Sequence, residues 1–68
     1  MTRVIYVTSD CAESFDFNAF NALSDKEKLS VAYNNEGMRI YTLYGFQFLF
    51  NSDLISDLGY IFIVNEES

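Results

Sequence analysis

One side chain in this 68-residue sequence has real nucleophilic potential, the thiol of Cys11. A cysteine attacks as its thiolate, which needs a neighbouring base or cation. The sequence contains no histidine, and the charged neighbours Asp10 and Glu13 are acids, which do not stabilise a thiolate. A lone cysteine also excludes an internal disulfide and a zinc site built from several thiolates. We therefore expect a structural cysteine in a protein that is not an enzyme and holds no cofactor or metal.

Two sets of acidic residues have a spacing that could serve a cation or acid–base catalysis. Asp10, Glu13 and Asp16 lie three residues apart, and Asp53 and Asp57 lie four apart. On a helix such residues share one side, where carboxylates could hold Ca²⁺ or Mg²⁺ or work as a catalytic pair. The alternating Asp/Asn loop with a central glycine that marks an EF-hand is missing. We expect solvated caps and loop acids, with weak divalent-cation binding as the alternative.

The aromatic residues are numerous for a small interior, with seven Phe and five Tyr in one chain. Four of them have polar neighbours that make their common burial difficult: Phe15, Phe17, Tyr44 and Phe48. Exposed aromatic clusters are typical of protein interfaces. We expect these four to contribute to an apolar patch that meets a protein partner or a second copy, in which case a two-fold homodimer is the simplest assembly. The alternative is that they complete a small core.

The charge balance is strongly acidic, at −6 near neutral pH. This disfavours direct nucleic-acid binding and anionic membrane surfaces, because both attract basic proteins. Solubility explains an acidic surface, and mimicry of nucleic acid toward a basic protein is the alternative. The longest mostly apolar stretch, residues 40–50, is far shorter than the roughly 20 residues that span a bilayer. We expect no membrane association and a cytoplasmic location.

The elements that must position these residues fit one domain, residues 1–68. Residues 3–8 and 60–64 are rich in β-branched and aromatic residues on both faces and predict two buried strands. We expect the least accessible side chains to include Ile5, Val7, Ile61 and Ile63. Residues 39–42 predict a third strand.

The central part of the chain predicts helices. Asp16 can cap a short helix, and Ser24 with Glu27 forms a capping box that begins a longer one. Residues 43–51 fit either a third helix, capped by Thr42, or a hairpin turned at Tyr44-Gly45. We favour the helix, because Tyr-Gly is a poor hairpin turn.

One stretch resembles known sequences. It comprises Ile40-Tyr41-Thr42-Leu43-Tyr44-Gly45-Phe46, then Phe50-Asn51, Ile55-Ser56-Asp57 and the Tyr-Ile-Phe-Ile strand. Residues 39–64 resemble small uncharacterised proteins of gut-bacterial phages and mobile elements. The resemblance implies a helix over residues 43–51, because such proteins tend to have charged residues where Tyr44 and Phe48 stand. The aromatic residues here depart from that pattern and keep the hairpin open.

These elements give an α+β fold, a small three-stranded sheet with two or three helices in the order β-α-α-β-α-β. The link between the first two strands is long enough for a right-handed parallel crossover. The function we expect is that of a small acidic protein-binding accessory module encoded by a phage or mobile element. The alternatives are an acidic mimic that inhibits a nucleic-acid-binding protein and, third, a small enzyme.

Overall fold

The computed structural model describes residues 1–55 and 59–67. Its elements, in chain order, are β1 (Thr2–Val7), α1 (Ser9–Ala12), α2 (Phe17–Asn21), α3 (Asp25–Tyr33), β2 (Met38–Thr42), α4 (Leu43–Asn51) and β3 (Tyr60–Asn65). The predicted α+β class and three-stranded sheet are confirmed. Within the described residues the short α1 is one helix more than the predicted order contained.

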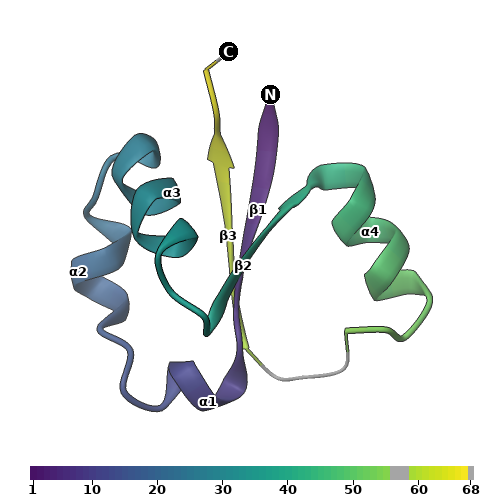
Figure 1. Cartoon of the computed structure of the whole chain (residues 1–68), viewed down its shortest axis with the longest axis horizontal. Helices are drawn as coiled ribbons and strands as arrows, with labels where there is room; N and C mark the ends of the chain where they lie inside the picture. The colour runs from purple at the N-terminus through teal and green to yellow at the C-terminus, as the bar shows by residue number, and fades with distance from the viewer. Residues whose placement is uncertain (56–58, 68) are drawn as a thin grey trace.

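The sheet has the order β2-β1-β3, and both outer strands run antiparallel to the central β1. The parallel crossover expected between the first two strands is therefore wrong. The N–H of Thr8 donates to the carbonyl oxygen of Gly37 at 2.9 Å, so β2 starts beside the end of β1. A long link permits either direction, and here α2 and α3 return the chain to the sheet end that it left (Figure 1).

Helices cover both faces of the sheet, but unequally. Helices α1, α2 and α3 lie on one face and α4 lies alone on the other (Figure 1). The core of the first face consists of Ile5, Val7, Phe20, Ala32, Met38, Phe62 and Val64. The core of the second face is smaller and consists of Val4, Tyr6 and Phe46. We call the second face, which carries α4, the α4 face.

Strand β3 is buried on one face only. Ile5 and Val7 of β1 are fully buried, as predicted, whereas Ile61 and Ile63 of β3 are 47% and 67% exposed. The prediction that both isoleucines are buried is wrong. Their register partners Tyr6 and Val4 place them on the α4 face, where α4 packs mainly on β1 and β2 and leaves β3 open.

The segment after β2 is a helix, and the hairpin alternative is wrong. The hydroxyl of Thr42 accepts a hydrogen bond from the N–H of Gly45 at 3.0 Å, which caps α4. Phe46 points toward the sheet and packs with Tyr6, their ring centroids 6.3 Å apart. Phe50 stacks on Phe46 one turn later and is still 56% exposed, so α4 buries only part of its aromatic content.

The central helices begin where capping residues predict them. The Asp16 carboxylate accepts from the N–H of Ala19, and the Ser24 hydroxyl accepts from the N–H of Glu27 at 3.2 Å. In a capping box the Glu27 carboxylate also accepts a hydrogen bond from the backbone N–H of Ser24, but here it accepts one from the Ser24 side chain instead. The Ser24 hydroxyl itself donates to the Glu27 carboxylate, also at 3.2 Å.

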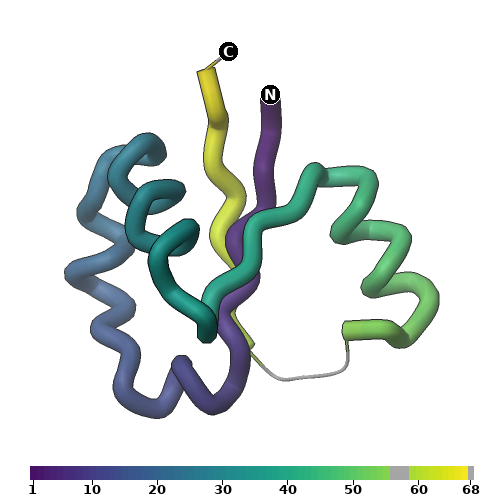
Figure 2. The backbone as a smooth tube through the Cα atoms, in the orientation of Figure 1, coloured from purple at the N-terminus to yellow at the C-terminus, as the bar shows by residue number. Residues whose placement is uncertain are grey.

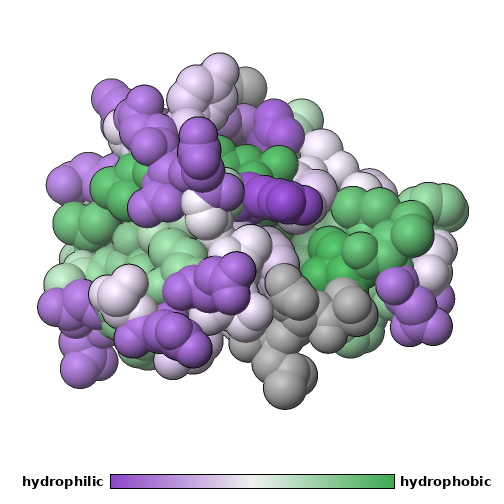
Figure 3. Space-filling view, turned by 60° about the horizontal axis from the view of Figure 1, so that its bottom comes forward, coloured by the Kyte–Doolittle hydropathy of each residue, from purple (hydrophilic) through white to green (hydrophobic). Residues whose placement is uncertain are grey.

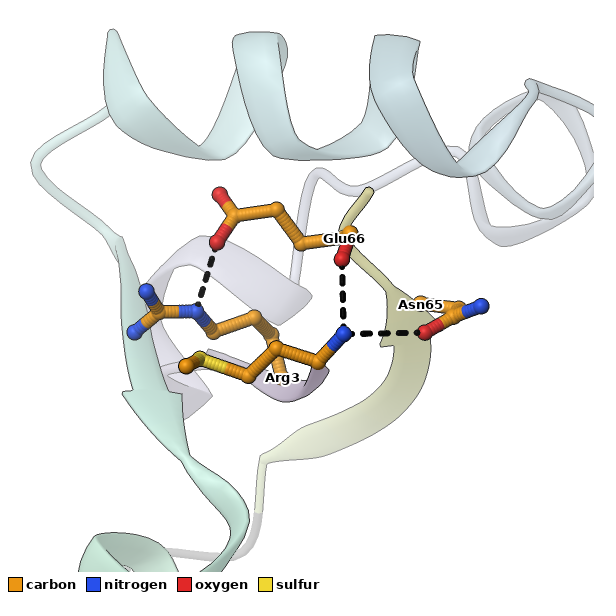
Figure 4. A network of polar contacts seen from close by, with 4 residues as sticks. Arg3, Asn65 and Glu66 are labelled. Atoms are coloured by element: carbon orange, nitrogen blue, oxygen red, sulfur yellow. Dashed lines mark hydrogen bonds and ion pairs between the residues drawn. The ribbon is translucent and has the colours of Figure 1, made fainter. Parts of the chain in front are cut away.

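The beginning of β1 and the end of β3 lie side by side (Figure 2). Met1 and Glu66 exchange two backbone hydrogen bonds of 2.7 Å. The guanidinium Nε of Arg3 forms an ion pair with the Glu66 carboxylate at 3.0 Å (Figure 4). From α3, the Asp25 carboxylate accepts the N–H of Asn65 at 2.9 Å. These contacts tie the end of β3 to β1 and to α3.

Candidate protein-binding surface

Phe15 packs among aromatic side chains of the first face. It is half-buried, and its ring centroid lies 5.3 Å from that of Phe20 and 5.9 Å from that of Phe62. Such separations are typical of packed aromatic pairs in protein interiors. Phe15 therefore extends the core between α1 and α2 to the first half of β3.

Phe17 extends the same aromatic cluster toward the surface. Its ring lies 5.3 Å from Tyr60 and 5.4 Å from Phe62, and 43% of the residue is exposed. One side of the ring thus packs on β3 and the other meets solvent.

Tyr44 and Phe48 lie on the opposite side of the sheet, one turn apart on α4. They are 83% and 66% exposed, so both rings point into solvent. The structure therefore divides the four predicted interface residues into two pairs, one on each side of the sheet. Only the α4 pair is predominantly exposed.

Further exposed apolar side chains accompany this pair on the α4 side. Two of them, Ile61 and Ile63, were predicted to be buried, so the sequence did not reveal this surface. We define the α4–β3 surface as Tyr44, Phe48, Phe50, Leu54, Ile61 and Ile63, which are 47% to 83% exposed. Figure 3 shows hydrophobic side chains gathered over α4, at the right of the view.

The two elements that carry most of this surface contain no charged residue. Neither α4 nor β3 contains Asp, Glu, Lys or Arg. Helix α3 on the other side is the opposite case, since Asp25, Lys26, Glu27 and Lys28 occupy its first four positions. Helix α4 and strand β3 are thus neutral and partly aromatic, as the desolvated centre of an interface typically is, while Arg39 of β2, the register partner of Tyr6, is an exposed cation on the same face.

The candidate chemical groups remain dispersed. Cys11 is half-buried against the first-face core, and its Sγ would lie 2.9 Å from a Cβ on Gly37. Asp10, Glu13 and Asp16 are all exposed. Among residues 1–55 and 59–67, no group of three or more His, Cys, Asp or Glu side chains could hold a metal ion. Asp57, one member of the second acidic pair, lies outside the described residues.

An open hollow lies between α3 and the end of β3. Its lining is mixed and includes Ser24, Lys26, Tyr33, Asn65 and Glu67. The lining also includes Asp25 and Glu66, but Asp25 accepts the N–H of Asn65 and Glu66 pairs with Arg3, so both carboxylates already serve structural contacts.

No helix in the described part of the chain has both the length and the apolar character needed to cross a membrane. Comparison with known proteins finds no matching family, no matching curated protein and no matching solved structure.

Proposed function

We propose that this chain is a small non-enzymatic protein-binding accessory module, of the kind encoded by phages and mobile elements, and that it binds through the α4–β3 surface. The observation that carries the proposal is the exposure of six large apolar side chains on α4, on the residues directly after it and on β3, where α4 and β3 contain no charged residue. Contiguous exposed apolar patches typically mark interaction sites, and the part of this surface on α4 is gathered in one place (Figure 3).

The chemistry of the surface favours a protein over other ligands. Aromatic side chains such as Tyr44 and Phe48 are over-represented among residues that dominate binding energy in protein complexes. Stacking on single-stranded nucleic acid uses similar rings but also requires lysine or arginine along the same surface. Neither α4 nor β3 provides any, and Arg39 of the neighbouring β2 is one cation on this face rather than a row of them.

Photo-crosslinking tests the proposal with an internal control. A photoreactive phenylalanine analogue would replace Phe48 in one variant and Tyr33, which is 85% exposed on α3, in the other. After irradiation in cells that encode the protein, we expect a protein adduct from position 48 and none from position 33. A further Tyr44→Ser change should abolish that adduct. Equal yields from the two positions, or an adduct that survives Tyr44→Ser, would contradict the assignment of the surface.

A further inference from the structure

The hydrogen-bonding pattern of β3 determines which of its backbone groups face outward. Met1 and Glu66 exchange both of their backbone hydrogen bonds, so they form a hydrogen-bonded antiparallel pair. Such pairs alternate along the ladder, so Phe62 and Val64 also direct their N–H and C=O groups toward β1. Ile61 and Ile63 must direct theirs away from the sheet. Asn65 lies two residues after Ile63 and therefore also directs its backbone groups outward. Its N–H donates to the Asp25 carboxylate on that side.

This outer edge of β3 is unprotected over its middle. Within the described part of the chain, no residue forms a hydrogen bond with the outward groups of Ile61 or Ile63. Natural proteins block open edges with lysine, proline, charges or a covering element. β3 contains no lysine, proline or charge, and the Asp25 carboxylate protects only its last residue. An edge of this kind readily accepts another strand.

We propose that the edge pairs with β3 of a second copy of this chain, antiparallel about a two-fold axis at Phe62. This inference rests on the proposed function and names its partner. The run Tyr60-Ile61-Phe62-Ile63-Val64 is nearly palindromic, so the two-fold axis sets Ile61 opposite Ile63 of the second copy. Their outward N–H and C=O groups then satisfy one another, and the isoleucines of both chains pack side by side on the α4 face.

Charge and area agree with a second copy as the occupant. A chain of charge −6 repels itself, and self-pairing is least opposed through β3, which carries no acid. A basic partner would instead require acidic residues along the edge, and the nearby Asp25 and Glu66 lie at its last residue, where they already bind Asn65 and Arg3. One strand pair covers less than the roughly 800 Å² per partner that stable complexes bury. The dimer should therefore dissociate on dilution.

Sedimentation equilibrium of charge variants tests both the pairing and its register. The purified protein should approach twice 7.8 kDa at high concentration and fall toward 7.8 kDa on dilution. Ile63→Glu should weaken self-association by about tenfold or more, because a charge on an edge opposes pairing. Mixing Ile63→Glu with Ile61→Lys should restore the dimer, because the register sets these two positions opposite each other. Tyr33→Lys, which adds the same charge on α3, should not restore it.

Each other outcome overturns the pairing. A protein that stays at 7.8 kDa at every concentration excludes self-association but leaves crosslinking at position 48 to decide the proposed function. A dimer broken by Phe48→Ser but unaffected by Ile63→Glu would be joined through α4 rather than β3. Equal rescue by Ile61→Lys and Tyr33→Lys would show a bulk charge effect and refute the register. Circular dichroism of each variant confirms that the monomer remains folded.

Discussion

The backbone carbonyl of Val7 occupies the space that a Cβ on Gly59 would need. Gly59 therefore allows the chain to pass close to the end of β1 just before β3 begins. We expect Gly59→Ala to lower the free energy of unfolding by about 1–3 kcal/mol, because the obstacle is backbone and must shift. Urea denaturation measures the change.

Gly45→Ala is the matched control for that measurement. A Cβ at this position would meet only the Thr42 hydroxyl, at 2.8 Å, and a side chain can rotate away. Alanine also favours a helix by roughly 1 kcal/mol over glycine, which offsets part of the lost cap. A Gly59→Ala protein no less stable than Gly45→Ala would contradict the close approach at Val7.

Ser24→Ala should lower the free energy of unfolding by about 0.5–2 kcal/mol, because the Glu27 N–H loses its hydroxyl acceptor at the start of α3. Ser30→Ala changes an exposed serine within the same helix whose hydroxyl caps nothing. That control should be neutral or slightly stabilising. Chemical denaturation of both variants separates capping from helix propensity, and equal effects would refute the cap.

Phe62→Ala should cost about 3–5 kcal/mol, which is most of the stability of a small domain. Phe62 is 6% exposed, and the rings of Phe17 and Phe20 lie 5.4 Å and 4.9 Å away. Phe48→Ala removes the same side chain from an exposed site and should change stability by less than about 0.5 kcal/mol. Thermal unfolding compares the two. A large loss for Phe48→Ala would mean that this ring is structural.

Salt should strengthen self-association or leave it unchanged. Raising NaCl from about 0.05 to about 0.5 M screens the repulsion between two acidic chains, while apolar contacts between uncharged elements remain. Binding of an acidic mimic to a basic protein responds in the opposite direction, because screening removes its main attraction. Sedimentation at several salt concentrations shows which of the two salt dependences the self-association follows. A dimer that dissociates as salt rises would contradict the neutral interface.

The sequence predicted those features that depend on neighbouring residues. The caps at Ser24 and Thr42 are local, because each hydroxyl reaches a backbone group three residues along the chain. The helical assignment of residues 43–51 followed from the same short-range chemistry. The three strands were recognisable because their β-branched and aromatic runs differ from the polar segments around them.

Features that depend on distant packing were not predictable. Ile61 and Ile63 have the same side chain as the buried Ile5, and their exposure depends on which strands α4 covers. The direction of β2 depends on where α2 and α3 return the chain. The polar neighbours of Phe15 and Phe17 in the sequence suggest exposure, but they do not determine where a ring packs. Only the arrangement of the elements separates them from Tyr44 and Phe48.

The central position of β1 has a consequence for synthesis of the protein. This strand is made first, but its two neighbours come from residues 38–42 and 60–65. On the ribosome, β1 remains without its β3 partner until residue 65 has left the exit tunnel. Until then Ile5, Val7 and Phe20 lack the cover of Phe62 and Val64. Folding must therefore wait for almost the whole described chain, and a nascent chain stalled before β3 exposes an apolar strand to chaperones and aggregation.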